Sequence, residues 1–505
     1  MFAAGATAAA GLTGVHWAPA ANLPSESCLI SGGLLVDGTG ASPRRADVRI
    51  SGRVISAVGT LKPIRGERVV QARGLVVSPG FIDAHSHADG GWTDAPDLES
   101  QIRQGITTAV VGQDGGSATP LETLRRAVRE RRPALNFVSY VGHGTLRRLA
   151  MGADYRRVAT PAELTAMSER LKSDLASGAV GLSTGLEYDP GFHSETSEVI
   201  ELARVAAAGG GRYISHIRNE DDRAFESFDE LFRIAREAPI PSQISHIKLG
   251  SQRVWGRASD ALGRISEARA SGLSITADIY PYLYWQSSAT VLNPARDWDD
   301  LSAWETSLQS IGGAAKVHLV RYTPRPEWAG RTLAELSTRE GKSPPEMLRA
   351  IARNTRGPDG SGSESVVVEA MQEADLRKFI RSPLVMFCSD GGPLSAHPRS
   401  AGSYPRVLGR YVRELRDLRL EEAIRKMTAF PASVFGLRDR GRVAAGLRAD
   451  LVLLDPVRVR DQATISDPKA RPVGIQWVFV NGRAVLAKGV MTGERPGRFG
   501  MDDGN

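Results

Sequence analysis

Cysteine is scarce in this sequence: Cys28 and Cys388 are the only two among 505 residues. Two thiols are too few for a disulfide framework or for a thiolate-rich zinc cluster. The chain also has no run of about 18 apolar residues, the length that a membrane-spanning helix requires. We therefore exclude a disulfide-stabilised scaffold and a cysteine-rich zinc module, and we expect no membrane partner.

Positive charge is in small excess over negative charge. The 64 Lys and Arg residues stand against 57 Asp and Glu residues, for a formal net charge of +7. The arginines are scattered, as at Arg125-Arg126, and no basic block is interleaved with aromatic residues. We interpret them as solvated helix faces and expect no nucleic-acid partner. A mildly positive field still favours a small anionic substrate.

Residues 1–27 are rich in Ala and Gly and lack the basic segment that opens a secretory signal. We interpret them as an N-terminal tail and expect a cytoplasmic protein. Export to the periplasm through an atypical or truncated signal remains the alternative. A homo-oligomer is also left open.

The rest of the chain has the composition of a large globular protein, with 41% hydrophobic and 24% charged residues. Short apolar segments separated by turns occupy residues 28–78 and return in residues 434–500. This pattern predicts one small β domain that is built from both ends of the chain. The segment between them, residues 79–433, alternates strand-like and helical patterns. The expected helices include Leu121–Arg132, Pro161–Ala176, Glu195–Ala208, Asp229–Glu237 and Ala258–Ala270.

The alternation has a period of about 30 residues, the size of one βα unit. Apolar runs end at polar positions: His85, Asp114 and His143 lie 29 residues apart, and His216 and His246 lie 30 apart. Eight such units form a (β/α)8 barrel, whose chemistry sits at the C-terminal ends of the strands. We therefore predict an α/β protein whose middle is a (β/α)8 TIM barrel.

One connection in this barrel is much longer than the others. Asp390 follows Tyr280 by 110 positions, and helical patterns occur between them at Leu333–Arg339 and Pro344–Arg353. We predict an inserted lid, residues 283–382, between strands 7 and 8.

Four histidines and one aspartate fall at the ends of these strands. His85 and His87 lie two residues apart on a strand, so both side chains point to one face and can reach one ion. His216 and His246 end consecutive strands and would lie side by side. Asp390 follows a buried apolar run, where a carboxylate needs a cation or hydrogen-bond donors. The pattern predicts a divalent metal ion that acidifies a water molecule, with Asp390 as general base.

Several segments carry a family resemblance. They are PGFIDAHSHAD (79–89), GITTAVVG (105–112), VGHGTLRRLAMG (141–152), GLSTGLEYDPG (181–191), SHIRNE (215–220), SHIK (245–248), SDG (389–391) and HPR (397–399). They resemble the amidohydrolase superfamily and, within it, the D-aminoacylase (N-acyl-D-amino-acid deacylase) family. The resemblance implies zinc, as one or two divalent ions, with other divalent metals left open. The metal and catalytic positions that it implies are His85, His87, His216, His246 and Asp390. The positions that it implies for binding the substrate are Tyr188, Lys248, Tyr282, Ser287 or Ser288, and Arg399.

This chain departs from the family pattern at one expected ligand. The resemblance implies a cysteine after GITTAVVG, where this chain has Asp114. A carboxylate can bridge two ions where a thiolate favours one tightly bound zinc. We therefore expect Asp114 to be a metal ligand. Glu187, after the fourth strand, is a second candidate bridge, with an exposed loop carboxylate as the alternative.

The expected activity is hydrolysis of the linear amide bond of an N-acyl amino acid, of D configuration by resemblance, to a carboxylate and a free amino acid. A guanidinium at Arg399 suits a small-molecule substrate that carries a carboxylate. The alternatives are ring opening of a cyclic amide, as by a dihydroorotase or hydantoinase, cleavage of an unusual dipeptide, and a non-catalytic scaffold.

Overall fold

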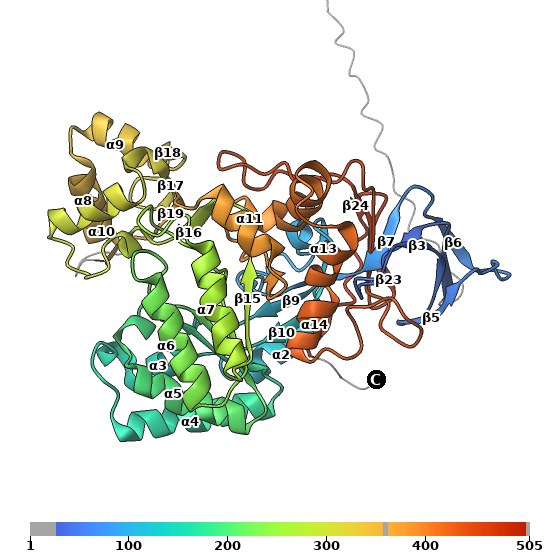
Figure 1. The fold of residues 1–505 in the computed structure, drawn as a ribbon, viewed down its shortest axis with the longest axis horizontal. Helices are drawn as coiled ribbons and strands as arrows, with labels where there is room; N and C mark the ends of the chain where they lie inside the picture. The colour runs from blue at the N-terminus through green and yellow to red at the C-terminus, as the bar shows by residue number, and fades with distance from the viewer. Residues whose placement is uncertain (1–26, 357–361, 501–505) are drawn as a thin grey trace, which may run out of the picture.

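The computed structural model describes residues 27–356 and 362–500. The expected N-terminal tail lies almost wholly outside the described residues. Three parts are visible: a central α/β unit, a β-rich unit of strands from both ends of the chain, and a smaller unit at the opposite end (Figure 1).

Parallel strands form the centre of the molecule. They are β8 (Phe81–Asp83), β9 (Ile106–Val111), β10 (Asn136–Ser139), β11 (Val141–Gly142), β12 (Gly181–Gly185), β13 (Arg212–His216), β14 (Ser242–Ile244), β15 (Ile275–Ile279) and β20 (Val385–Phe387). Their hydrogen-bonded orders are β10-β9-β8 and β11-β12-β13-β14-β15-β20. Only Tyr140 separates β10 from β11, so one sheet follows the other along the chain. Every strand residue except Arg212 is buried, as expected of a parallel sheet that is covered by helices.

The first and last of these strands meet just beyond their ends. The Asp390 amide donates to the His85 carbonyl at 2.9 Å, and the His87 amide donates to the Gly391 carbonyl at 2.9 Å. The described residues form no ladder between β8 and β20 themselves. These bonds therefore join the two loops that carry predicted ligands.

Helices follow most strands and cover the sheets. They are α1 (Glu99–Ile102), α2 (Leu121–Arg131), α3 (His143–Met151), α4 (Pro161–Ala176), α5 (Thr196–Ala208), α6 (Ala224–Glu237), α7 (Ala258–Ala270), α11 (Glu373–Arg381), α12 (Arg399–Arg406), a π-helix (Val407–Glu414), α13 (Leu420–Met427) and α14 (Ala429–Phe435). Thr160 and Glu163 form a capping box at the start of α4, which explains why its start was predictable. Helix α6 begins five residues earlier than predicted because Phe225 and Phe228 extend its buried face. Short helices occur at Gly152–Asp154, Gly191–His193, Ala289–Leu292, Ala314–Lys316 and Pro326–Trp328.

The β-rich unit combines strands from both ends of the chain. One sheet has the order β24-β23-β22-β21-β7-β2-β3 and the other β5-β4-β1-β6. The N-terminal strands are β1 (Ser27–Ser31), β2 (Leu34–Leu35), β3 (Arg44–Arg45), β4 (Asp47–Ser51), β5 (Val54–Gly59), β6 (Arg68–Gln71) and β7 (Val76–Pro79), and the C-terminal ones are β21 (Leu451–Leu454), β22 (Ile475–Val480), β23 (Arg483–Ala487) and β24 (Val490–Met491). Val77 of β7 pairs with Leu453 of β21, and both side chains lie in the core between the sheets.

The segment between β15 and β20 forms a unit with its own hydrophobic core, which includes Trp304, Leu336 and Met347. It contains a sheet of order β16-β19-β17-β18 and the α-helices α8, α9 and α10. Their bounds are β16 (Tyr284–Ser287), α8 (Leu301–Ser310), β17 (Val317–Tyr322), β18 (Arg331–Thr332), α9 (Leu333–Glu340), α10 (Pro344–Arg356) and β19 (Glu364–Glu369). This unit is the yellow end of the molecule in Figure 1.

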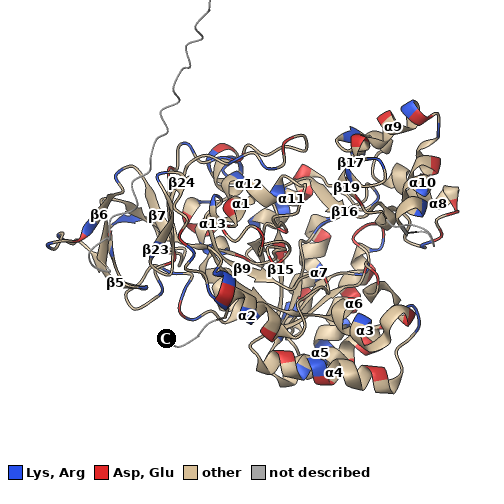
Figure 2. Ribbon diagram, turned by 180° about the vertical axis from the view of Figure 1, so that it is seen from behind, with Lys and Arg blue, Asp and Glu red and all other residues tan. Residues whose placement is uncertain are grey.

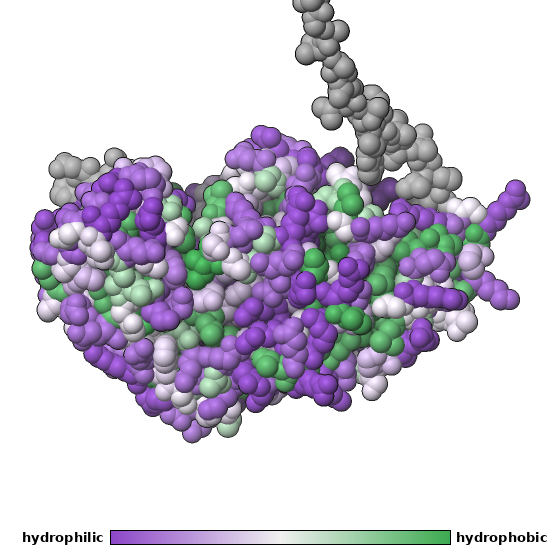
Figure 3. All heavy atoms as spheres, turned by 90° about the horizontal axis from the view of Figure 1, so that it is seen from above, coloured by the Kyte–Doolittle hydropathy of each residue, from purple (hydrophilic) through white to green (hydrophobic). Residues whose placement is uncertain are grey.

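The surface mixes polar and apolar side chains. Lys and Arg alternate with Asp and Glu along the outer helices α3 to α6 (Figure 2). Hydrophilic residues cover much of the face seen in Figure 3, and hydrophobic residues appear there as separate patches. Among the described residues, no helix is long and apolar enough to cross a membrane.

Candidate metal centre and active site

The predicted ligands come from loops and strand ends at one edge of the parallel sheets. His85 and His87 follow β8, Asp114 follows β9, His216 ends β13, His246 follows β14, and Asp390 follows β20. Asp114, His246 and Asp390 have positive φ angles of 53°, 31° and 48°. Such backbone is costly for residues with a side chain and is concentrated at functional sites.

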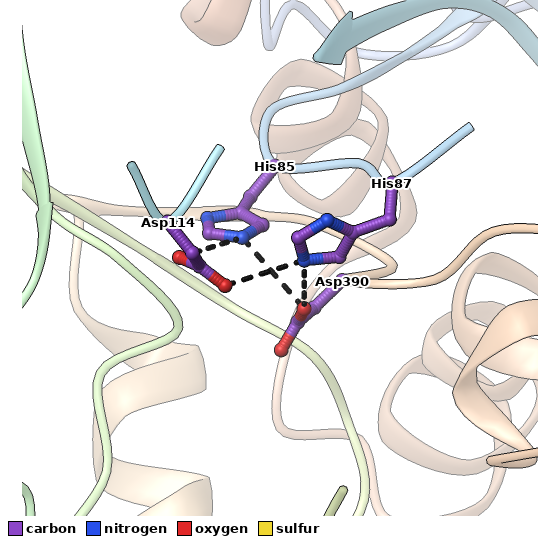
Figure 4. Close-up of side chains that lie close together, drawn as sticks. All are labelled: His85, His87, Asp114 and Asp390. Atoms are coloured by element: carbon purple, nitrogen blue, oxygen red, sulfur yellow. Dashed lines mark ion pairs between the residues drawn. The ribbon is translucent and has the colours of Figure 1, made fainter. Parts of the chain in front are cut away.

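Two histidines and two aspartates point at one another in the first cluster (Figure 4). His85 Nε2 lies 3.4 Å from Asp114 Oδ1 and 3.7 Å from Asp390 Oδ1. His87 Nε2 lies 3.3 Å from Asp114 Oδ2 and 3.2 Å from Asp390 Oδ1. Because these ligand atoms all lie within 4.8 Å of one another, one cation can be bound by all four residues.

The hydrogen-bonding state of this cluster supports a cation. His85 Nδ1 and Nε2, Asp114 Oδ1 and Asp390 Oδ1 are buried and have no hydrogen-bond partner among the described residues. Unpartnered buried polar atoms are costly, and a divalent ion would satisfy three of these four atoms at once. The residues present therefore fit a metal ion.

A second cluster shares Asp114 with the first. His246 Nε2 lies 3.6 Å from Asp114 Oδ1 and 3.1 Å from His216 Nδ1. The two carboxylate oxygens of Asp114 thus face different groups: Oδ2 faces His87, while Oδ1 lies between His85 and His246. Asp114 therefore contacts histidines of both clusters.

Carboxylates behind this second cluster hold its histidines. Glu187 Oε2 contacts His216 Nε2 at 2.8 Å, and Glu220 Oε1 contacts His246 Nδ1 at 3.0 Å. Lys248 Nζ donates to Glu220 at 2.6 Å. Glu187 therefore lies on the far side of His216 rather than between the two clusters. Glu220 was missed as a site residue, although its position four residues after His216 was available as a signal.

Local charges set the protonation of the site. Burial alone would raise the pKa of Asp390, but the Arg399 guanidinium, 2.6 Å from its Oδ2, and His246 hold that pKa well below its usual range. Burial and Lys248 lower the pKa of His246, yet Glu220 and Asp390 outweigh them and raise it to about 10. Asp390 is consequently ionised at neutral pH.

The clusters open into a pocket of about 360 Å³. Tyr188, Lys248, Ser287 and Arg399 line it, as does the candidate bridge Glu187. Pocket residues that sequence reasoning missed come mainly from the inserted unit and the loop after β20. They include Trp285, Gln286, Val291, Arg321, Ser365, Leu394 and Ser395.

The structure does not bring Tyr282 into this pocket. Its hydroxyl donates to Asp461 at 3.0 Å, and its ring lies under Arg406. The chain bends at Pro281, so Tyr280 takes the position nearer the site, with its ring 4.6 Å from the Arg399 guanidinium carbon.

The strand-end histidines, the acidic residues and the fold define a class of protein, and sequence comparison identifies the same class. The model of the amidohydrolase family matches residues 68–278 and 351–486, and the chain belongs to this family. The predicted resemblance is thereby confirmed.

Two relatives within this class are similar over almost the whole chain. An N-acyl-D-glutamate deacylase of Alcaligenes xylosoxydans xylosoxydans is 38% identical, over 93% of this chain and 96% of that protein. A D-aminoacylase of the same organism is 35% identical, over 93% of this chain and 96% of that protein.

A solved relative is similar over almost its full length. It is the N-acyl-D-glutamate deacylase of Bordetella bronchiseptica, complexed with zinc and a phosphonate mimic of the tetrahedral intermediate. Its TM-score is 0.84 at 36% identity, covering 94% of this chain and 98% of that one.

Proposed function

We propose that this protein is a metal-dependent amidohydrolase that cleaves N-acyl-D-amino acids to a carboxylate and a free amino acid. One observation carries the proposal: buried histidine and aspartate atoms without partners converge at the pocket where the loops after β8, β9 and β20 meet. The deacylases and D-aminoacylase described above support the substrate class, because they are similar over more than nine-tenths of the chain.

The ligand set is proposed to bind one or two zinc ions. His85, His87, Asp114 and Asp390 would hold one position, and Asp114, His216 and His246 the other. A divalent ion bound there polarises the scissile carbonyl and lowers the pKa of a water molecule. The zinc in the similar deacylase supports this choice of metal.

The protein's own groups then move the proton and hold the substrate. Asp390 Oδ1 faces the cluster and accepts a proton from the attacking water, and it returns that proton to the leaving nitrogen. Arg399 holds Oδ2 and keeps the carboxylate ionised. Arg399 also lines the pocket, where its guanidinium can donate to the substrate α-carboxylate. Lys248, Tyr188 and Ser287 line the same pocket and complete this subsite.

We also propose the finer divisions of the fold. Residues 79–433 form a closed (β/α)8 barrel, residues 28–78 and 434–500 form the small β domain, and residues 283–382 form a lid. The bonds between the loops after β8 and β20 support closure. The pocket residues that come from the insertion support a lid.

The test is release of free amine from paired N-acetyl-D- and N-acetyl-L-amino acids by zinc-loaded protein. We expect turnover with a preference for the D series. Turnover of cyclic amides alone would instead identify a ring-opening enzyme, and no turnover of any amide would identify a scaffold.

A further inference from the structure

One cation in the pocket, Arg321, has no anionic partner among the residues that the structure describes. The Lys and Arg side chains that line the pocket are Lys248, Arg399 and Arg321. Lys248 is paired with Glu220 at 2.6 Å and Arg399 with Asp390 at 2.6 Å. Arg321 is exposed, and within residues 27–356 and 362–500 it makes no ion pair and no side-chain hydrogen bond. Its charge is therefore available to a ligand.

A β-bulge explains why Arg321 faces the pocket. On β17, Val317 and Leu319 point into the core of the inserted unit. Regular alternation would place Arg321 on that same buried face. The register instead shifts between Leu319 and Arg321, so that Tyr322 takes the next core position. The extra residue thus turns Arg321 away from the core, as bulges beside binding sites commonly do.

Polar side chains beside Arg321 are held in place by hydrogen bonds to one another. Ser365 on β19 is its cross-strand partner and also lines the pocket. Gln286 donates to Ser365 Oγ at 2.9 Å and accepts from Ser395 Oγ at 2.7 Å. Ser395 belongs to the loop after β20, so this chain of hydrogen bonds ties the insertion to the catalytic side of the pocket.

We propose that Arg321 binds a second carboxylate of the substrate, in addition to the α-carboxylate held near Arg399. The inference rests on the proposed deacylase function and specifies its substrate class: N-acyl amino acids with two carboxylates. A guanidinium presents a planar pair of donors that matches a carboxylate, and none of the described pocket residues pairs with Arg321. The second carboxylate can belong to the amino-acid side chain or to the acyl group, because both extend from the scissile amide.

The experiment compares four substrates on zinc-loaded protein. N-acetyl-D-glutamate carries the second carboxylate on the side chain, and N-succinyl-D-norleucine carries it on the acyl group. N-acetyl-D-glutamine and N-acetyl-D-norleucine carry only the α-carboxylate and serve as the counterparts that are neutral at the second position. Each is assayed with the wild type, with Arg321→Gln, and with Arg331→Gln, which changes an exposed arginine on neighbouring β18 outside the pocket lining.

We expect Arg321→Gln to lower kcat/KM for one of the dicarboxylic substrates by roughly tenfold to a hundredfold, mainly through KM, since a charged hydrogen bond is lost. Both neutral substrates and the Arg331→Gln control should stay within about twofold of the wild type. The substrate that responds identifies the source of the carboxylate.

Other outcomes overturn the inference. An equal loss on neutral and dicarboxylic substrates would place Arg321 at the α-carboxylate, and an unchanged kcat/KM on all four would remove it from recognition. In both cases the deacylase function stands. No turnover of any N-acyl amino acid by the wild type would defeat the proposed function and the inference together.

Discussion

Single residues decide the chemistry of this site, and Asp390 shows how one carboxylate serves two purposes. Its Oδ2 accepts from Arg399 at 2.6 Å, while its Oδ1 faces His87 at 3.2 Å and has no hydrogen-bond partner among the described residues. The paired oxygen keeps the group ionised, and the other oxygen remains free for metal and proton.

Asp390→Asn should separate catalysis from metal binding. The amide retains an oxygen ligand and its shape but cannot accept the proton, so we expect kcat to fall roughly 10²- to 10⁴-fold. Metal content by atomic absorption should change little. Asp260→Asn, at an exposed aspartate on α7 that pairs with Arg257, is the control. An Asp390→Asn enzyme with wild-type kcat would show that another group is the base.

We expect Asp114 to decide how many ions the site holds. Because it contacts both histidine clusters, its loss as Asp114→Ala should reduce the bound metal by at least one ion per chain at saturation. Asp114→Cys, which restores the ligand that the family resemblance implies, should retain one tightly bound zinc. Metal titration by calorimetry measures both. Wild-type stoichiometry in Asp114→Ala would contradict the bridging role.

At the scale of elements, local signals set the helices and strands, whereas packing places them. The capping box at Thr160 starts α4, and the alternation of Val48 and Ile50 with polar neighbours marks β4 as a half-buried strand. The bulge in β17 is different, because it follows from how the inserted sheet packs on its own core. No residue pattern within β17 signals it.

An ion pair joins the strands of the N-terminal sheet and gives a prediction about pH. Arg49 of β4 donates to Glu67, at the start of β6, at 2.7 Å, and Ser27 of β1 donates to the same oxygen at 2.7 Å. The Arg49 hydrogen bond outweighs burial and lowers the pKa of Glu67 to about 2 from an ordinary value of 4.5. The ionised carboxylate therefore stabilises the fold above pH 4.5, and this contribution is lost as the pH falls toward 2.

We expect Glu67→Gln to lower the melting temperature at pH 7, with a difference from the wild type that shrinks between pH 4.5 and the lowest pH at which both remain folded. Differential scanning calorimetry across this range checks it. Glu494→Gln, at an exposed glutamate that follows β24 of the other sheet, is the control. A difference that does not depend on pH would mean that the charge of Glu67 contributes nothing.

At the scale of the whole molecule, the metal site joins segments that are far apart in the chain. Its proposed ligands span positions 85 to 390, and the loops after β8 and β20 are hydrogen-bonded to each other beside it. An ion bound there would crosslink the ends of the first and last parallel strands. Residues of the inserted unit line the same pocket, so its packing contributes to the shape of the site.

Removal of the metal should therefore destabilise the central unit. An ion present at 1,000 times its dissociation constant stabilises the folded state by about 4 kcal/mol. We expect chelation to lower the melting temperature, and added zinc to restore it. Asp390→Asn, which keeps its ligands, should show the same shift, whereas Asp114→Ala should show a smaller one. An identical melting temperature with and without metal would contradict this crosslink.

The sequence alone determined the periodic α/β middle, the β-rich ends, the four histidines and Asp390, because strand ends and helix caps are local features. Membership of the amidohydrolase family followed from the same motifs. Only the tertiary structure decided that Glu220 holds His246, that Tyr280 rather than Tyr282 approaches the site, and that Arg321 faces the pocket. These facts depend on contacts between segments far apart in the chain and on the packing of the inserted unit, and neither leaves a periodic signal in the residues themselves.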